Sequence, residues 1–346
     1  MMTRRRVRER GTDFGPAADI ERAAVLERCC LRALLFPGAA VSAGRCPRGP
    51  LFPRAVRSHP PRARGRRYRR HVPDAPAKTP LVRALWGATH PGPTLVVTTL
   101  SLALGVAAGL EPWRLLLLVV AVFAGQVSVG LSNDAIDAGR DVAVGRTDKP
   151  VASGALTPER ALGVAVASLA VALALSAPLG PGLVAAHAIA LASAWAYNAG
   201  VKSTPLSIVP FLVSFGLFPS FPTLALPAPA LAAPWASLAG AALGAAVHLT
   251  NVVRDLDDYR ATGVRGLPHR LGARVSVVAA AAGIVLGAVA VFAGSGGGVV
   301  GGVFFAAVVL VAVATIALAV GRPPGRAVFR LTMLAALLLA AQLVVT

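Results

Sequence analysis

The sequence contains few charged residues. Only 14% of its 346 residues are Asp, Glu, Lys or Arg, whereas 55% are hydrophobic, and the mean hydropathy is +0.68. This composition excludes both an ordinary soluble domain and a disordered protein, because neither keeps so much apolar surface in contact with water. It indicates an integral membrane protein.

Cysteine is also scarce. The three cysteines (Cys29, Cys30 and Cys46) all lie near the N-terminus and have no partners at metal-ligand spacing. This pattern indicates neither a zinc site nor a disulfide framework, and it is typical of free thiols. The sequence also lacks a phosphate-binding Walker loop, a dinucleotide-binding glycine fingerprint and a catalytic triad pattern.

Acidic residues are fewer than basic ones, and the net charge is +19. Residues 1–80 hold 19 Lys and Arg against 6 Asp and Glu, whereas residues 81–346 hold 15 against 9. The charge therefore marks an N-terminal extension rather than a nucleic-acid-binding domain. We expect residues 1–80 to be a disordered, Pro- and Arg-rich extension and residues 81–346 to form one membrane domain.

Long apolar runs begin at Thr94 and continue to the C-terminus. Each is close to the roughly 20 residues that a helix needs to cross a bilayer. The runs are continuously apolar rather than alternating, which favours helices over a transmembrane barrel. We therefore predict an all-α membrane protein with nine transmembrane helices in a single bundle. The expected spans cover residues 94–110, 115–132, 161–177, 182–198, 205–221, 236–252, 275–293, 299–320 and 327–345.

Basic residues are distributed unevenly between the loops that join these spans. Alternate loops carry the cations, and the intervening loops carry little but Arg114. Because positively charged loops stay on the cytoplasmic side, we expect a plasma-membrane protein with its N-terminus in the cytoplasm and its C-terminus outside. The cations of the cytoplasmic loops are Arg140, Arg146, Lys149, Arg160, Lys202, Arg254, Arg260, Arg265, Arg270, Arg274, Arg322 and Arg326.

Nine acidic residues follow residue 80, and seven of them fall in two short segments. Both segments occur where an apolar run ends in a basic cytoplasmic loop, so they can share one cavity at the membrane surface. Ionisable groups at such depth are costly and are usually functional. The first segment holds Asp134, Asp137, Asp141 and Asp148, and the second holds Asp255, Asp257 and Asp258.

The spacing within the first segment is specific. Asn133, Asp137 and Asp141 stand at i, i+4 and i+8, which on a helix places one amide and two carboxylates along a single face. Like charges at this spacing repel one another unless a cation lies between them. Hard oxygen ligands without a nearby His or Cys indicate Mg²⁺, which is usually completed by water and substrate phosphates.

The second segment repeats the pattern, with Asn251, Asp255 and Asp258 at i, i+4 and i+7. Two facing carboxylate sets flanked by Arg and Lys can form a diphosphate site bridged by metal. The alternative is that these are ordinary solvated carboxylates that pair with neighbouring arginines. Two clusters on one side, taking most of the acidic residues, make that alternative the weaker one.

These motifs resemble those of a known family. Residues 133–141 read NDAIDAGRD and are followed by Arg146 and by Asp148, Lys149 and Pro150 in a row. This segment resembles the first aspartate-rich motif of the UbiA superfamily of intramembrane prenyltransferases. Residues 251–268, NVVRDLDDYRATGVRGLP, resemble its second motif. The similarity extends over about residues 80–346 and includes the number of helices.

The resemblance implies a reaction in which an isoprenyl diphosphate loses diphosphate and the resulting carbocation alkylates a small acceptor, often an aromatic ring. It implies Mg²⁺ as the cofactor. By position, Asn133, Asp137 and Asp141 would bind one Mg²⁺, and Asp255 and Asp258, with Asn251 beside them, the other. The diphosphate would be held by Arg146, Lys149, Lys202 and Arg265, and Tyr197, Lys202 and Lys149 would be the catalytic residues.

The second motif departs from the family pattern in one respect. Many members carry aspartates four residues apart, but the fourth position after Asp255 is Tyr259, with Asp257 and Asp258 before it. Asp258 still reaches the same helix face. Which carboxylate is the second ligand is therefore left open.

Three other polar features bear on the site. We expect His187, in the middle of a span, to have a hydrogen-bonded packing role. His248 precedes Asn251 by three residues and could face the cavity. Gly263, Gly266 and Pro268 allow sharp turns in the loop after the second motif, so Arg265 could close on a phosphate.

Other functions are also possible on this scaffold, and some fit the sequence as well as a transferase does. A membrane terpene cyclase, in which the cation is captured by its own chain, needs the same metal site. A lipid or sugar acceptor, or a phosphoribosyl donor, would be a further variant. A transporter would place its charges near the bilayer midplane on interrupted helices, whereas these acids lie at span ends. We expect the partners to be an isoprenyl diphosphate, a small acceptor and membrane lipid. We expect no binding of nucleic acid, and the sequence gives no sign of a protein partner.

Overall fold

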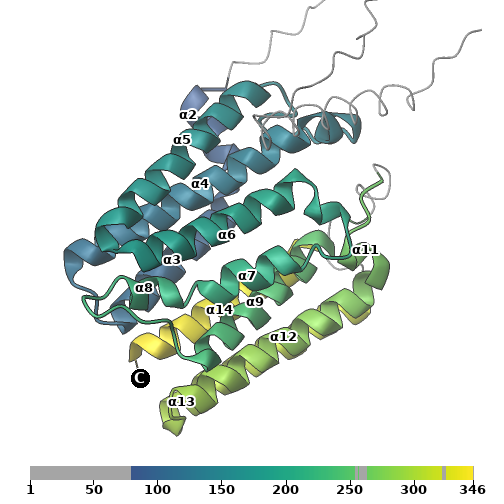
Figure 1. Cartoon of the computed structure of the whole chain (residues 1–346). Coiled ribbons are helices and arrows are strands. Elements are labelled where there is room, and N and C mark those ends of the chain that lie inside the picture. The colour runs from purple at the N-terminus through teal and green to yellow at the C-terminus, as the bar shows by residue number, and fades with distance from the viewer. Residues whose placement is uncertain (1–78, 254–255, 257–262, 322–324, 346) are drawn as a thin grey trace, which may run out of the picture. The chain divides into compact units, whose positions relative to one another are not determined.

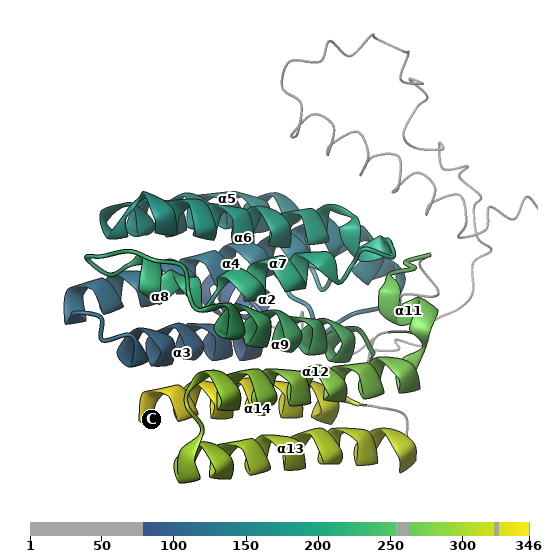
Figure 2. The same cartoon turned by 60° about the horizontal axis from the view of Figure 1, so that its bottom comes forward.

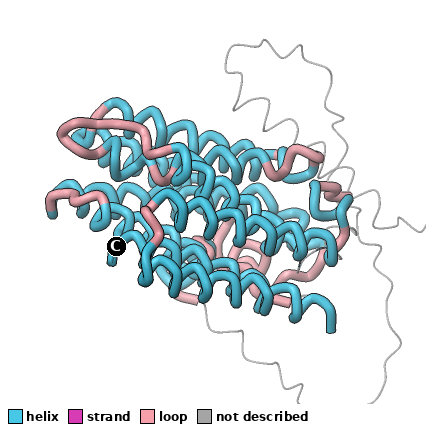
Figure 3. Tube along the Cα trace, turned by 90° about the horizontal axis from the view of Figure 1, so that it is seen from below, coloured by secondary structure: helices cyan, strands magenta, loops and turns pink. Residues whose placement is uncertain are grey.

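The structure, a computed structural model, describes residues 79–253, 256, 263–321 and 325–345. Every regular element in these ranges is a helix, and the tube in Figure 3 contains no strand. The predicted all-α class is therefore confirmed. The expected extension, residues 1–80, falls almost wholly outside the described residues.

The helices follow the apolar runs of the sequence. Six of them within the described ranges (α4, α5, α9, α12, α13 and α14) are long and apolar enough to cross a membrane, and two shorter apolar helices cover Pro91–Ala107 and Pro205–Leu217. The count of nine spans and the orientation of the termini stay predictions. The helices are α2 (Leu81–Ala88), α3 (Pro91–Ala107), α4 (Pro112–Ala143), α5 (Pro158–Ser176), α6 (Pro181–Ala199), α7 (Val209–Leu217), α8 (Ser220–Leu224), α9 (Pro234–Val253), α11 (Leu267–Leu271), α12 (Ala273–Gly294), α13 (Gly298–Gly321) and α14 (Arg326–Val345).

Proline marks where many of these helices begin. Its fixed φ and missing N–H suit the first position of a helix, whose N–H has no intrahelical partner. A side-chain cap is added at α5, where the Thr157 hydroxyl accepts a hydrogen bond from the Arg160 N–H at 3.3 Å. The helices that start with proline are α3, α4, α5, α6 and α9.

The helices of residues 79–346 lie side by side in a layered bundle (Figures 1 and 2). Helix α4 packs along α5 and α3, and α9 packs along α12 and α7. Figure 2 shows α5 at one face of this bundle and α13 at the opposite face, against α12 and α14. The largest buried side chains between the layers include Leu118, Leu183 and Ile284.

Glycines on α9 let α7 approach closely. A Cβ added at Gly240 would lie 2.2 Å from the carbonyl oxygen of Phe215, and one at Gly244 would lie 2.6 Å from that of Phe211. Small residues at helix contacts are the usual means of close packing in membranes. The short helix α7 therefore rests directly on the α9 backbone.

Helix α4 is longer than the span predicted from its apolar run. Its 32 residues extend over about 48 Å, whereas the hydrocarbon core of a bilayer is about 30 Å thick. The predicted span ended at residue 132, but the helix continues without a break to Ala143. The polar residues from Asn133 onward thus lie on the last turns of a continuous helix.

The contact between α4 and the turn before α3 can be tested with two glycines of the same helix. A Cβ at Gly130 would lie 2.5 Å from the backbone oxygen of Thr89, whereas nothing lies within 4 Å of a Cβ at Gly139. We expect Gly130→Ala to destabilise the protein by about 1–3 kcal/mol through overpacking. Gly139→Ala should be neutral or stabilising by up to about 1 kcal/mol. Thermal unfolding of both purified variants in detergent measures this, and equal stabilities would contradict the contact.

Candidate active site

A cavity of about 550 Å³ lies between α3, α4, α6, α7, α9 and α14. One end is polar and the other is apolar and aromatic. The polar end is lined by Asn133, Asp134, Arg140, Asp141, Arg146, Asp148, Lys149 and Asn251, and the apolar part by Val97, Val122, Phe211, Phe215, Phe218, Phe221 and Met333. A polar mouth on an apolar chamber can hold a molecule that has a charged head and a hydrophobic tail.

Three carboxylates of α4 are buried at the polar end. Asp134, Asp137 and Asp141 are 1%, 3% and 5% exposed. Taking a carboxylate out of water is costly unless a cation and hydrogen bonds compensate it. Each of the three is accordingly paired with a basic side chain from another segment or from the next turn of α4.

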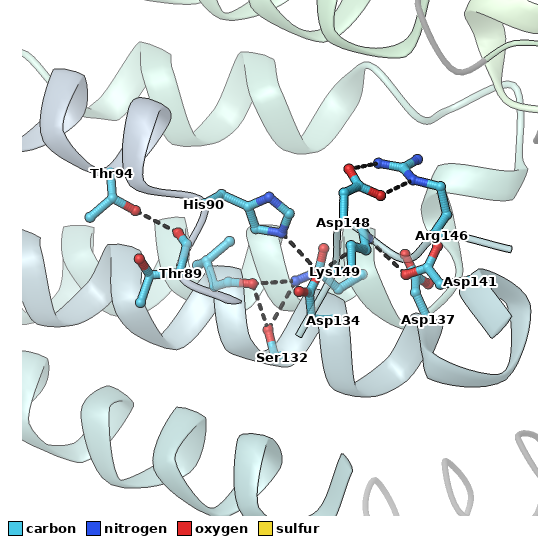
Figure 4. A network of polar contacts seen from close by, with 12 residues as sticks. Thr89, His90, Thr94, Ser132, Asp134, Asp137, Asp141, Arg146, Asp148 and Lys149 are labelled. Atoms are coloured by element: carbon cyan, nitrogen blue, oxygen red, sulfur yellow. Dashed lines mark hydrogen bonds and ion pairs between the residues drawn. The ribbon is translucent and has the colours of Figure 1, made fainter. Parts of the chain in front are cut away.

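Lys149 lies between two of these carboxylates (Figure 4). Its Nζ donates to Asp141 Oδ2 at 2.7 Å and lies 3.1 Å from Asp134 Oδ1. Burial lowers the pKa of Lys149, but the charges of Asp134 and Asp141 outweigh it and hold the pKa above its usual value. The ammonium therefore stays charged and holds the two carboxylates together at the cavity wall.

His90 makes a third contact in this cluster. Its Nε2 lies 3.0 Å from Asp134 Oδ1, and its backbone has a φ of 56°, in the left-handed region that side chains rarely adopt. The turn is held by the Thr94 hydroxyl, which donates to the Thr89 carbonyl at 2.7 Å. A strained backbone held by its surroundings is common at functional sites. His90 was not among the predicted site residues, although a histidine at the start of an apolar run was a usable signal.

Asp137 is enclosed by two cations. Lys202 Nζ donates to its Oδ1, and Arg140 Nη2 forms an ion pair with its Oδ2. Lys202 stands in the short 3₁₀ turn Val201–Ser203 after α6 and is 6% exposed. Neither Asp137 nor Lys202 is among the residues that line the cavity. The structure therefore brings these two predicted residues together, but just behind the cavity wall.

A more exposed ion pair forms the rim of the polar end. Arg146 donates from Nε and Nη2 to the two carboxylate oxygens of Asp148, at 2.9 and 3.2 Å. Arg326 Nη2 lies 3.8 Å from Asp148 Oδ2. The hydrogen bonds from Arg146 lower the pKa of Asp148. Arg146, as predicted, lines the cavity.

The second predicted motif is only partly described. Asn251 is half-buried on α9 and lines the cavity opposite the α4 residues. Asp255, Asp258 and Tyr259 lie outside the described residues, so their roles stay predictions. Arg265 is exposed and is not among the lining residues, so the structure does not bring it to the cavity.

A serine that was not predicted as a site residue anchors the segment after this motif. Ser207 Oγ accepts a hydrogen bond from the Leu267 N–H at 2.9 Å and lies 3.0 Å from His248 Nε2. A Cβ at Gly266 would lie 2.4 Å from the Lys202 carbonyl oxygen. The beginning of α11 therefore docks directly on the turn that carries Lys202.

Aromatic rings form a continuous wall along the cavity. Tyr197 meets Phe211 edge to face at 5.1 Å between ring centroids. Phe211 is followed by Phe215 at 6.2 Å, Phe218 at 6.4 Å from Phe215, and Phe221 at 5.4 Å from Phe218. Of these residues only Tyr197 was predicted. The i, i+4, i+7 spacing of the first three phenylalanines was the available signal.

The donors of the polar end suit a hard cation. Among the described residues no three His, Cys, Asp or Glu side chains converge closely enough to form a metal site alone. Asn133, Asp141 and Asn251 nevertheless present oxygens to one cavity from α4 and α9, and Asp134 Oδ2 is buried without a hydrogen-bond partner in the part of the chain that is described. Mg²⁺ accepts such a partial oxygen set because water and phosphate oxygens complete its coordination.

Comparison with known families gives a match over most of the chain. The model of the UbiA prenyltransferase family matches residues 94–344, in agreement with the resemblance of the two motifs. No curated protein sequence matches the chain at a significant level.

Solved structures with a similar fold include a UbiA homolog from Aeropyrum pernix K1, with a TM-score of 0.62 and 22% identity over 72% of this chain and 97% of that one. A UbiA homolog from Archaeoglobus fulgidus bound to GPP and Mg²⁺ has a TM-score of 0.56 and 14% identity, over 76% and 100% of the two chains. A digeranylgeranylglyceryl phosphate synthase has a TM-score of 0.55 and 14% identity, over 77% and 99%. These likenesses show that the fold is shared.

The anchoring role of Ser207 can be tested against a neighbouring serine. Ser207→Ala removes the acceptor of the Leu267 N–H, so we expect hydrogen–deuterium exchange at residues 264–268 to increase by about tenfold, which corresponds to a lost hydrogen bond of about 1–1.5 kcal/mol. Ser203, in the same connection, is exposed, and Ser203→Ala is the matched control with unchanged exchange. Equal exchange in both variants would contradict the anchor.

Proposed function

The chain belongs to the UbiA prenyltransferase family, and from this premise we propose that it transfers a prenyl group from an isoprenyl diphosphate, bound with Mg²⁺ at the polar end of the cavity, to an aromatic acceptor within the membrane. The observation that carries the proposal is the buried cluster of Asp134, Asp141 and Lys149 at the mouth of an aromatic-lined cavity. The cluster suits the charged head of such a donor, and the chamber suits its chain.

The donor and the metal are supported by relatives of the same fold. Homologs from Archaeoglobus fulgidus have been solved with GPP and Mg²⁺ and with DMAPP and Mg²⁺. In this chain the residues proposed to hold the metal present only oxygen donors, as Mg²⁺ prefers. When bound, Mg²⁺ would neutralise the negative charge that develops on the leaving diphosphate. The proposed ligands are Asn133, Asp137, Asp141, Asn251, Asp255 and Asp258. Asp137, which lies behind the cavity wall and is paired with Lys202 and Arg140, would have to leave one of these partners to bind the metal.

Basic residues would complete the stabilisation of the leaving group. The C–O bond of the donor breaks, and its electron pair leaves with the diphosphate. Cations fixed in a water-poor site stabilise this charge far more than they would in water. Lys149 and Arg146 already line the polar end, and Lys202 lies behind Asp137. Arg265, exposed in this structure, would have to swing inward to take part.

The allylic cation that remains must be kept away from water and from groups basic enough to take a proton from it. Water would quench it, and the apolar lining of the chamber beneath the polar end offers water few hydrogen-bond partners. The faces of aromatic rings attract cations by about 0.5–2 kcal/mol each. Tyr197 lines the same cavity as Asn133 and meets Phe211 at 5.1 Å between ring centroids, so we assign Tyr197 to the position closest to the reacting carbon.

A purified-protein assay tests this function. We expect Mg²⁺-dependent diphosphate release from geranyl, farnesyl or geranylgeranyl diphosphate only when an aromatic acceptor is added, with a prenylated acceptor as the product. Asp137→Asn and Asp255→Asn should each lower the rate by about 10²–10³-fold, because each removes charge stabilisation of the transition state. Glu159→Gln, in the exposed first turn of α5, is the control with unchanged activity.

The same assay separates the alternatives. Release without an acceptor, with a cyclic hydrocarbon as the product, would identify a terpene cyclase on this scaffold. Full activity of both aspartate variants would refute the metal assignment. No release from any donor would refute the proposed donor class and direct the search to phosphoribosyl donors.

We also propose that the polar end of the cavity faces the cytoplasm at the plasma membrane, because the cations gather in the loops on that side. Labelling of single cysteines in intact cells tests this orientation, after Cys29, Cys30 and Cys46 are changed to serine. A membrane-impermeant maleimide should leave Thr147→Cys unlabelled and should label Ala228→Cys, both at exposed loop positions. The opposite result would invert the topology.

A further inference from the structure

An arginine outside both aspartate-rich motifs reaches the mouth of the cavity. Arg326 is the first residue of α14, and it lines the polar end together with Arg146, Asp148 and Lys149. Its side chain is 66% exposed, so its guanidinium group is open to a ligand that enters the mouth. This residue belongs to none of the sets assigned above to the metal or to the diphosphate.

Two guanidinium groups converge on the carboxylate of Asp148. Arg146, in the loop after α4, donates to both of its oxygens at 2.9 and 3.2 Å (Figure 4). Arg326 Nη2 lies 3.8 Å from Asp148 Oδ2, which is longer than a hydrogen bond. One carboxylate therefore joins cations from two segments that are far apart in the sequence, and their convergence marks a place at the rim that suits an anion.

The contact between Arg326 and Asp148 is the weaker of the two. Both side chains are more than half exposed, and ion pairs of this kind contribute about 0–1 kcal/mol. A diphosphate carries more negative charge than a carboxylate, and its oxygens can accept paired, charge-assisted hydrogen bonds from one guanidinium group. A diphosphate in the mouth would therefore bind Arg326 more strongly than Asp148 does.

The same face of α14 continues from the rim into the apolar chamber. Arg326, Phe329 and Met333 stand at i, i+3 and i+7 and all line the cavity. The distance from Arg326 to Met333 along the helix is about 10 Å. A molecule that lies along this face can place an anionic head at Arg326 and an apolar chain against Phe329 and Met333. An isoprenyl diphosphate has this form, and so has an anionic lipid.

Building on the proposed function, we propose that Arg326 binds the diphosphate of the prenyl donor, and that Asp148 holds Arg326 at the rim until the diphosphate takes its place. Asp148 can keep its two hydrogen bonds from Arg146 during this exchange, because only the longer contact is given up. The bound donor then connects the start of α14 to the carboxylate and lysine cluster of α4 and its following loop.

Helix α14 itself offers a matched control. Arg330 stands about one turn after Arg326, is exposed and is not among the residues that line the cavity. Arg326→Gln and Arg330→Gln remove the same charge from neighbouring turns, so a general electrostatic effect would change both variants alike. Arg326→Lys keeps the charge but loses the paired donors of the guanidinium group.

The first measurement is the affinity for geranyl S-thiolodiphosphate, a donor analogue that releases diphosphate poorly, by calorimetry in lipid-free detergent with Mg²⁺. Arg326→Gln should weaken binding by about tenfold or more, as expected for lost hydrogen bonds to a charged group. Arg326→Lys should lose less, and Arg330→Gln should bind as the wild type does. Unchanged affinity in Arg326→Gln, equal losses in Arg326→Gln and Arg330→Gln, or no binding by the wild type would overturn the proposal.

A double-mutant comparison tests the exchange with Asp148. Asp148→Asn removes the competing anion, so we expect it to tighten binding of the analogue by about threefold or more in the wild-type background. In the Arg326→Gln background the same change should have a clearly smaller effect, because the two residues act on one contact. Equal effects in the two backgrounds, or weaker binding by Asp148→Asn alone, would overturn the role of Asp148.

A lipid headgroup as the ligand of Arg326 gives a different result. The protein would then retain less phosphatidylglycerol after Arg326→Gln, while its affinity for the analogue in lipid-free detergent would stay the same. That combination would overturn the assignment to the donor.

The last measurement is turnover with geranyl diphosphate, Mg²⁺ and the acceptor found in the activity assay. Arg326→Gln should raise the KM for geranyl diphosphate by about tenfold or more and leave the KM for the acceptor unchanged, which a merely structural role would not do. A rise in both KM values would overturn the role of Arg326. Absence of any prenylated product, together with the expected loss of affinity in Arg326→Gln, would refute the proposed reaction but support the diphosphate site.

Discussion

Buried negative charge on one helix face is the constraint on which this structure depends. Asp134, Asp137 and Asp141 lie on the last turns of α4, inside a bundle whose low dielectric makes an uncompensated carboxylate very costly. Arg140 of α4 itself supplies one compensating group. The others come from elsewhere: His90 from the turn before α3, Lys149 from the loop after α4, and Lys202 from the turn after α6. These connections must therefore meet at one end of the bundle, and the polar mouth of the cavity is where they meet.

The apolar part of the cavity provides a surrounding with few polar atoms, in contrast to the charged mouth. The glycines of α9 let α7 pack closely, and α7 carries phenylalanines into the cavity wall. Below the charged mouth the chamber thus offers ring faces and few polar atoms. Heterolysis of a C–O bond separates charge, and this division of one cavity into an anion-stabilising end and a cation-tolerating interior matches both products of the separation.

The sequence contained the types and spacing of the site residues but not their partners. Periodicity alone placed Asn133, Asp137 and Asp141 on one helix face, and the continuous apolar runs predicted the all-α class. It could not show that Lys202 would pair with Asp137, 65 residues earlier, or that Ser207 would hold Leu267, 60 residues later. Such contacts follow from packing between helices, which local sequence does not encode. The left-handed backbone of His90 likewise depends on the turn that surrounds it.

Helix α4 links both ends of the chamber without a break, from Gly125 beside His187 to Asp141 beside Lys149. Each helical residue adds 1.5 Å and turns the chain by about 100°. The number of residues between two positions on this helix therefore fixes both their separation and their relative direction. Substitutions on its lipid-facing side can accumulate, but insertion or deletion of one residue between these points would rotate the carboxylates out of the cavity. Evolution can therefore reshape this chamber by changing side chains, whereas its length is fixed by the register of a single helix.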